Sequence, residues 1–239
     1  MARDIVDEGT LRATDCKALP DRPRLYFFFG KPAYRSKDDM VRSDHLGHFP
    51  FVFLIDPNLV ETPLHVFPFD TGAALANRFD IAADNTVPFE DYALEPALGS
   101  ARHMLGWAFA SVDDYLSGNI RSGLTGTVPR HELTTSSFLK IAQLASSTHN
   151  DHETYDGRAS AIEVCLDRNV SLANGVDMVV VPDALLDEGK ETENGAFLDR
   201  LTQLGIRWET YHWRPQLTPA DFHNDIEAIL RGHLQALIP

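Results

Sequence analysis

The sequence predicts an α+β fold with a mixed, largely antiparallel sheet, a helical middle section and a C-terminal helix. Short apolar runs that are typical of strands lie towards both ends of the chain. Between them, at about 94–147, apolar residues recur at steps of three and four, which is the period of a helix. Strands that cluster at both ends around a helical middle favour an α+β fold over a regular βαβ winding.

Length and composition indicate one globular domain over residues 1–239. A chain of 239 residues is close to the size of about 250 residues at which a single hydrophobic core stops growing. Its 44% hydrophobic and 23% charged residues are typical of a globular protein. The formal net charge of −14 repels phosphate backbones, so nucleic acid is disfavoured as a partner.

The first third of the chain predicts one helix and three strands. Residues 2–8 have the pattern of a helix end, because Gly9 stands where a left-handed residue terminates a helix. The three strands are expected at 25–29, 49–55 and 64–69. The first is aromatic and ends at Gly30, which predicts a central strand buried on both faces. Pro68 in the third indicates an edge strand or a bend.

The middle section predicts two helices, the first over 98–116. The second begins at a capping hydroxyl, either Thr134 or Thr135. Between them, 119–130 carries glycine and proline among polar residues and is a candidate lid. A polar stretch at 146–156 is the expected linker.

The last third predicts further strands and a strongly signalled final helix. Strands are expected at 161–166, 178–181 and 206–213, with a helix near 197–204 that Gly205 ends. Thr218 supplies a capping hydroxyl, Pro219 suits the first helical position and Asp221 places an acid in the first turn. Apolar residues at helical spacing after this signal give the final helix a face that covers one side of a sheet.

The sequence offers neither a secretory signal nor a membrane-spanning segment. The first residues lack a basic start and an apolar stretch. The longest apolar block, Phe49 to Ile55, is far shorter than the roughly 20 residues that cross a bilayer. We therefore expect a cytoplasmic protein with no membrane partner. Cys16 and Cys165 lack the number and spacing of a disulfide framework, so reduced thiols are expected.

Common catalytic and metal motifs are absent from the sequence. The pairs His45 with His48 and His149 with His152 are dense in histidine, but the acid follows the second pair, so it is not HExxH. No metal is expected on this basis. The chain contains no G-x-S-x-G turn, and the apolar neighbours of Cys165 predict a small buried side chain rather than a nucleophile.

One candidate binding segment follows the first predicted strand. Lys31, Tyr34 and Arg35 place two cations and an aromatic ring just after the strand end. Such an edge suits an anionic, ring-bearing ligand, because Arg35 or Lys31 can bind a pyrophosphate and Tyr34 can stack on a heterocycle. The alternative is a strand-end turn in which Arg35 pairs with one of the many acids.

A second candidate segment begins at Arg158 and Ser160 and leads into the strand that carries Glu163. Glu163 interrupts an apolar run, and strand alternation places it on the same face as Cys165. If both faces of the sheet are covered, this carboxylate must be paired or used on a substrate. If the sheet is half exposed, Glu163 is an ordinary outward residue.

A third wall of the same cleft is predicted at the turn after the 64–69 strand. Asp70 or Thr71 would face Glu163 from there. The alternative is a turn in which Asp70 only closes an Asx cap before the following apolar stretch.

This layout resembles that of ADP-ribosyltransferase-like proteins, particularly their bacterial toxin and defence branch. The resemblance covers about a third of the chain: Ile5 to Leu11, the strand followed by Tyr34-Arg35, and the late strand with Glu163. In that family a helix ending in a G-x-L turn leads into a split sheet that cradles NAD, and a late strand bears a catalytic glutamate.

Two family positions do not map directly onto this sequence. The His or Arg of the family's first strand would precede Ile5. The family's usual tyrosine or serine has three contenders here, namely Tyr26, Tyr34 and Thr71.

The resemblance implies an enzyme that consumes NAD, releases nicotinamide and transfers ADP-ribose to an unknown acceptor or to water, without a metal. Glu163 would bind a ribose hydroxyl and stabilise the positive charge that develops on the sugar. Arg35 would hold the pyrophosphate, and Tyr34 would stack against nicotinamide or fix the ribose. Further candidate contacts to the nucleotide are Lys31, Tyr26, Asp70, Thr71, Arg158 and Ser160.

Two other function classes remain open at this point. One is a noncatalytic nucleotide-binding, sensor or interaction domain that keeps the cleft without turnover. The other is a metal-dependent hydrolase that uses His149, His152 and a distant acid. The expected partners are a nucleotide-type small molecule and a protein that serves as acceptor or inhibitor.

Overall fold

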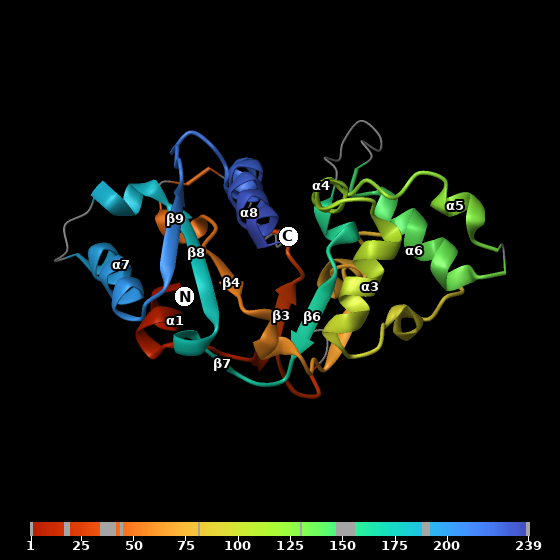
Figure 1. The fold of residues 1–239 in the computed structure, drawn as a ribbon, viewed down its shortest axis with the longest axis horizontal. Helices are drawn as coiled ribbons and strands as arrows, with labels where there is room; N and C mark the ends of the chain where they lie inside the picture. The colour runs from red at the N-terminus through yellow and green to blue at the C-terminus, as the bar shows by residue number, and fades with distance from the viewer. Residues whose placement is uncertain are drawn as a thin grey trace. The chain divides into compact units, whose positions relative to one another are not determined.

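A computed structural model of the chain describes residues 2–16, 20–33, 42–43, 45–80, 82–129, 131–146, 156–187 and 192–237 (Figure 1). Its fold is α+β with a largely antiparallel set of sheets and a C-terminal helix, as predicted. The chain, expected to form one domain, divides by its contacts into two compact units. Unit 1 comprises Met1–Thr14, Tyr34–Leu59 and Arg168–Pro239, and unit 2 comprises Asp15–Ala33 and Val60–Asp167.

Unit 1 is built on a three-stranded sheet in the order β4-β8-β9. These strands are β4 (Val52–Ile55), β8 (Val176–Pro182) and β9 (Arg207–Tyr211). β4 pairs with β8 in antiparallel register, whereas β9 runs parallel to β8. The parallel pair is joined through α7 (Glu193–Gln203), so this part of the unit is a βαβ connection. The apolar run of β8 is buried at every position except Asp177, as expected for a central strand.

Helices cover both faces of this sheet. Figure 1 shows α8 (His223–Leu237) on one side of β8 and β9, with α7 and α1 (Ala2–Glu8) on the other. Phe222, Ile226 and Leu230 form one buried cluster with side chains of β8 and β9. On the other face the rings of Phe51 and Phe197 meet edge to face, 5.7 Å apart. Each face of the sheet is therefore closed by an amphipathic helix.

Local end signals in unit 1 match the sequence predictions. Gly9, with a φ of 65°, follows α1 and precedes a small sheet of β1 (Thr10–Leu11) with β7 (Val170–Ser171). Gly205, with a φ of 72°, follows α7. Thr218 and Asp221 form the predicted capping box ahead of α8. In the described parts of both units, the short 3₁₀ turns are η1 (Leu46–His48), η2 (Pro57–Val60), η3 (Phe89–Tyr92), η4 (Gly157–Ser160), η5 (Leu172–Asn174), η6 (Asp183–Asp187) and η7 (Pro219–Phe222).

Unit 2 contains a four-stranded sheet in the order β2-β3-β6-β5. Its strands are β2 (Thr14–Asp15), β3 (Pro23–Phe28), β6 (Glu163–Leu166) and β5 (His65–Phe67). The interior position of β3 and the edge position of β5 agree with the sequence predictions. The expectation that β3 is buried on both faces is wrong, because Tyr26, Phe27 and Phe28 are only half-buried. β6 is the strand that is buried at every position.

The described helices of unit 2 lie in the predicted middle section, except α2, which precedes it, and two of the predictions there need correction. They are α2 (Thr71–Leu75), α3 (Leu98–Ala108), α4 (Val112–Ser117), α5 (Leu124–Thr127) and α6 (Leu133–Gln143). The helix expected over 98–116 is two helices, because Phe109 is extended and the Ser111 side chain caps α4 by accepting from the Asp114 amide. The expected loop 119–130 contains the single turn of α5.

The N-cap of α6 differs from the sequence prediction. Glu132, rather than Thr134 or Thr135, stands at the N-cap of α6, and both threonines lie within its first turn. Most of the linker expected at 146–156 lies outside the described residues. Among the described helices, none has both the length and the apolarity that crossing a lipid bilayer requires.

The Tyr115 hydroxyl of α4 forms a hydrogen-bonded brace between the end of β3 and the start of β6. Its side chain is 1% exposed, and its hydroxyl donates to the Phe29 carbonyl at 2.7 Å. The same oxygen accepts the Ile162 amide at 3.2 Å. Phe29 and Ile162 follow β3 and precede β6, so one phenol closes the sheet ladder where the backbone pairing ends. Burial raises the pKa of this phenol, which stays protonated.

Replacing Tyr115 by Phe tests this brace. The substitution leaves a buried carbonyl and a buried amide without their partner, so we expect the free energy of unfolding to fall by about 2–3 kcal/mol. Tyr92→Phe is the matched control, since the Tyr92 hydroxyl contacts one side chain, Ser137 Oγ at 2.5 Å, and its loss should cost about 1 kcal/mol. Urea unfolding of both variants measures the difference. Equal losses would contradict the brace.

Candidate active site

The candidate site lies on one face of the unit 2 sheet. The antiparallel register sets Glu163 opposite Phe28 and Phe67. Cys165 is set opposite Tyr26 and His65 in the same way. Residues opposite one another in an antiparallel pair project to the same face, so these side chains share one surface. This is the face that alternation predicted for Glu163 and Cys165.

Glu163 is buried and both of its carboxylate oxygens are held by one residue. Its exposed fraction is 2%. The Thr71 hydroxyl donates to Oε1 at 2.6 Å, and the Thr71 amide donates to Oε2 at 3.1 Å. These two hydrogen bonds offset part of the cost of burying a carboxylate. They also fix the orientation of the side chain.

Thr71 is presented by a short turn that the sequence anticipated. Asp70 is the N-cap of α2, and its Oδ1 accepts the Ala73 amide at 2.9 Å. The expected Asx cap is therefore formed, and Thr71 also faces Glu163 as the cleft prediction proposed. Burial raises the pKa of Asp70 to about 6 against the opposing Ala73 hydrogen bond, and the charge of Glu163 acts in the same direction as burial.

His65, from the edge strand β5, lies beside the same carboxylate. Its Nε2 is 3.7 Å from Glu163 Oε1, and its Nδ1 is 3.4 Å from a guanidinium nitrogen of Arg24. A guanidinium only donates hydrogen bonds, so Nδ1 acts as the acceptor and the proton of a neutral ring stands on Nε2. That nitrogen is buried and makes no hydrogen bond with the described residues. The N–H therefore faces Oε1 across a gap that is too long for a hydrogen bond.

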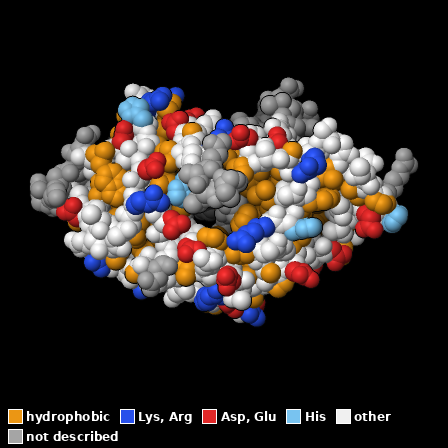
Figure 2. Space-filling model, viewed as in Figure 1, with side chains coloured by type: hydrophobic (Ala, Val, Ile, Leu, Met, Phe, Trp, Pro, Cys, Tyr) orange, Lys and Arg blue, Asp and Glu red, His pale blue; other side chains and the backbone are white. Residues whose placement is uncertain are grey.

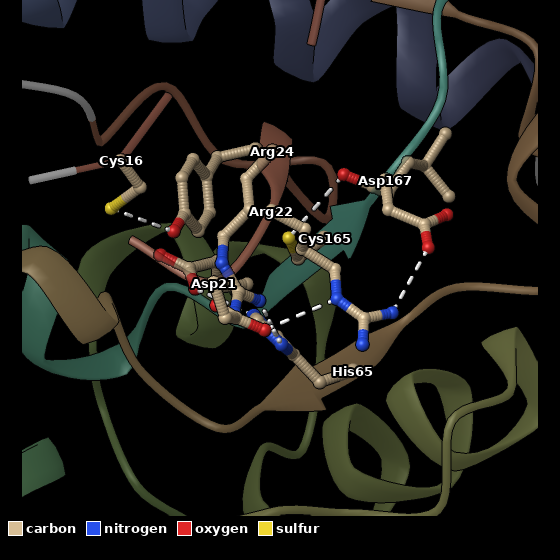
Figure 3. A network of polar contacts seen from close by, with 10 residues as sticks. Cys16, Asp21, Arg22, Arg24, His65, Cys165 and Asp167 are labelled. Carbon is tan, nitrogen blue, oxygen red and sulfur yellow. Dashed lines mark hydrogen bonds and ion pairs between the residues drawn. The ribbon is translucent and has the colours of Figure 1, made fainter. Parts of the chain in front are cut away.

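Arg24 anchors a polar network next to His65. Figure 3 shows its guanidinium directed towards Asp21 and His65, and it forms an ion pair with Asp21. Arg22 extends the network at the surface, with contacts to Asp21 at 3.1 Å and Asp167 at 3.4 Å. The buried Arg24 thus fixes the side of His65 that is turned away from Glu163.

The Tyr26 hydroxyl and the Cys165 thiol are both kept protonated by their surroundings. The Tyr26 hydroxyl donates to Cys16 Sγ at 3.3 Å. Burial is the main cause that raises the pKa of Tyr26, and this hydrogen bond is the second. Burial raises the pKa of Cys165 to about 11, so the thiol is protonated at neutral pH. Cys165 is fully buried, as the sequence predicted.

Lys31 and Ser160, two expected nucleotide contacts, are brought together. Lys31 Nζ donates to Ser160 Oγ at 2.8 Å and to the Tyr115 carbonyl at 3.0 Å. It also lies 5.5 Å from the centroid of the Tyr115 ring. Lys31 is 6% exposed and Ser160 is fully buried, so both side chains act within the protein. Their contacts join the end of β3 to η4 and α4.

Arg158, another expected nucleotide contact, has an acid beside it. Its guanidinium pairs with Asp156 through two short contacts, Nε to Oδ1 at 2.9 Å and a terminal nitrogen to Oδ2 at 2.6 Å. Its carbonyl accepts the Asp70 amide at 3.1 Å, so η4 and the start of α2 are in direct contact. The positive charge of Arg158 opposes the rise in the pKa of Asp70.

Four of the residues named in the sequence predictions fall outside the part of the chain that the structure describes. Tyr34 and Arg35, the expected stacking ring and pyrophosphate ligand, lie outside the described residues, as do His149 and His152. Among the residues that are described, no group of three or more His, Cys, Asp or Glu is arranged to hold a metal ion.

Two residues of this face were missed by the sequence reading. His65 is the first residue of β5, which was predicted as a strand without a role for this side chain, and Arg24 precedes the aromatic run of β3. Period-2 alternation places both on a face with polar neighbours, and this pattern was the signal that could have identified them.

Comparison of the chain with protein-family models, curated proteins and solved structures finds no match.

The raised pKa of Asp70 predicts a pH-dependent stability. The folded protein holds the Asp70 proton more tightly than the unfolded chain, whose pKa is near 3.8. The stability linked to this proton is complete below about pH 4 and is lost as the pH rises through about 6. We expect the free energy of unfolding, relative to Asp70→Asn, to fall by about 2–3 kcal/mol between pH 4 and pH 7.

Urea unfolding of both proteins across this pH range provides the measurement. Asn keeps an oxygen for the Ala73 amide, so the substitution removes the titrating charge without removing the cap. Asp80→Asn, at an exposed position of unit 2, reports the general effect of losing one carboxylate. A wild-type curve parallel to that of Asp70→Asn would refute the assignment.

Proposed function

We propose that this chain is an ADP-ribosyltransferase-like enzyme that cleaves the nicotinamide bond of NAD and passes ADP-ribose to an acceptor or to water. The observation that carries the proposal is the Glu163 carboxylate, which stands at the start of the central strand β6, is buried, and is fixed through both oxygens by Thr71. The resemblance of the sequence to ADP-ribosyltransferase-like proteins also indicates Glu163 as the catalytic glutamate.

Cleavage of the nicotinamide bond is accelerated by a carboxylate that is fixed beside the ribose. The bond between ribose C1′ and the nicotinamide nitrogen breaks, and its electron pair leaves with neutral nicotinamide. The ribose becomes positively charged in the transition state, as in glycoside hydrolysis. A fixed carboxylate stabilises that charge more than it stabilises the ground state, so it lowers the barrier. The acceptor oxygen then forms a bond to C1′ and gives up its proton.

The two hydrogen bonds from Thr71 leave part of the acceptor capacity of Glu163 unused. A carboxylate has about four acceptor sites, and Thr71 occupies two of them. Under the proposal, one of the remaining sites accepts a ribose hydroxyl. Of the two contenders that the structure describes, Thr71 is supported better, because it contacts Glu163 whereas the Tyr26 hydroxyl is bonded to Cys16.

The remaining features of the proposed function come from the sequence. A nucleotide-type small molecule is the substrate, and a protein, a small molecule or water is the acceptor. Arg35 and Tyr34 keep their proposed roles at the pyrophosphate and the nicotinamide. The activity is proposed to be cytoplasmic and metal-independent, in a toxin or defence effector.

Glu163→Gln tests the proposal directly. We expect the purified protein to release nicotinamide from NAD, and the variant to lose at least about 100-fold in kcat, because Gln carries no charge for the transition state. Glu209→Gln, the same change at an exposed position of β9, is the matched control and should leave the rate unchanged. Nicotinamide release is followed by chromatography, with thermal unfolding to verify that both variants fold.

Two results would contradict the assignment. Full activity in a folded Glu163→Gln variant would remove the catalytic role. Stabilisation of the wild type by NAD without any nicotinamide release would favour the noncatalytic nucleotide-binding function instead.

Thr71 should act as a positioning residue for Glu163. Thr71→Val removes the hydroxyl donor but keeps the amide donor, so we expect kcat to fall about 10-fold with little change in KM. Thr71→Ser keeps both donors and should restore most of the rate. Steady-state kinetics of the two variants separates the roles: equal activity of Val and Ser variants would show that the hydroxyl is not used.

A further inference from the structure

Unit 2 contains a concave region whose described lining includes none of the predicted site residues. Residues of α3, of α6 and of the segment around η3 line a half-open cavity of about 730 Å³. We call it the aromatic cavity. In Figure 2, hydrophobic side chains come to the surface over the part of the molecule that contains α3 and α6. Its volume lies within the range of about 300–1,000 Å³ that is usual for small-molecule sites.

The inner wall of the aromatic cavity is made of flat rings and a thioether. Trp107 and Phe138 face one another with ring centroids 6.2 Å apart, and Tyr92 and Met104 complete this wall. The Tyr92 hydroxyl is bonded to Ser137, so it is engaged within the protein. Rings and a methionine sulfur favour an aromatic ligand body, through stacking and sulfur–ring contacts.

The rim of the aromatic cavity is acidic. Asp91 and Glu95 line it and are exposed, and neither carboxylate makes a hydrogen bond or ion pair with another described residue. No lysine or arginine occurs among the described lining residues, where His103 is the one basic side chain. The formal net charge of −14 adds to the same field. An anion is disfavoured here, and a cation gains from both the carboxylates and the indole face of Trp107.

We propose that the aromatic cavity binds an organic cation with an aromatic body, of the arylalkylamine class. The ring lies among Trp107, Phe138 and Met104, and the ammonium group lies at the rim near Asp91 and Glu95. This inference does not depend on the proposed NAD chemistry, because the two regions share no described residue. It assigns the cavity a ligand of its own, bound without a chemical step.

A series of three probes with one ring system tests the charge requirement. Tryptamine carries a positive charge, tryptophol is neutral and indole-3-acetate is negative. Isothermal titration calorimetry at pH 8, where an ordinary histidine is neutral, should give tryptamine an affinity at least about 10-fold higher than tryptophol, with indole-3-acetate weakest. Equal affinities for the three probes, or no binding of tryptamine at millimolar concentration, would overturn the proposal.

Substitutions in the wall and the rim locate the binding. Trp107→Ala should weaken tryptamine and tryptophol together by about 10-fold or more, because it removes the ring surface that both use. The double variant Asp91→Asn with Glu95→Gln should reduce tryptamine to the affinity of tryptophol and leave tryptophol unchanged. Asp80→Asn, which removes an exposed carboxylate outside the lining, is the control. Tryptamine binding that is indifferent to the wall and rim substitutions would place the ligand elsewhere and refute the assignment.

Discussion

The arrangement of the candidate site depends on one constraint, the need to satisfy a buried carboxylate on a central strand. An ionised carboxylate removed from water costs several kcal/mol unless donors reach it. Thr71 supplies both donors to Glu163, and it can do so only if α2 begins at that residue. The Asp70 cap fixes that beginning through the Ala73 amide. The turn after β5 therefore has the conformation that lets Thr71 donate two hydrogen bonds to Glu163 on β6.

The same principle explains why several expected ligand-binding residues act inside the protein. The sequence predicts Lys31 and Ser160 as ligand contacts, but both are buried and the Lys31 ammonium donates a hydrogen bond to the Ser160 hydroxyl. Tyr115 closes the gap between the ends of β3 and β6 with a single hydroxyl. Buried polar groups that brace strand ends in this way resist exchange for apolar ones, because each leaves a partner unsatisfied. Rigid strand ends are in turn what a precisely held Glu163 requires.

Local patterns predicted the parts of the fold that local chemistry decides. The glycine after α1 and the capping box before α8 are set by neighbouring residues and were read correctly. The break between α3 and α4 was missed, because apolar spacing continues through Phe109 while Ser111 caps a new helix. Alternation gave the face of Glu163, but its partner Thr71 is 92 residues away and was left open between a cleft wall and a turn. Only the strand register, which the sequence does not contain, brings them together.

Two neighbouring acids give the site its electrostatic character. Glu163 accepts two hydrogen bonds from Thr71, whereas Asp70 accepts the Ala73 amide and has a pKa near 6, so the two carboxyl groups sit in unlike environments. With a pKa near 6, Asp70 is largely ionised at neutral pH, and a buried negative charge favours any positive charge that forms beside it. Under the proposed function, that positive charge is the ribose of the transition state, while the departing nicotinamide becomes neutral. Asp70 would then contribute to catalysis through its field without touching the substrate.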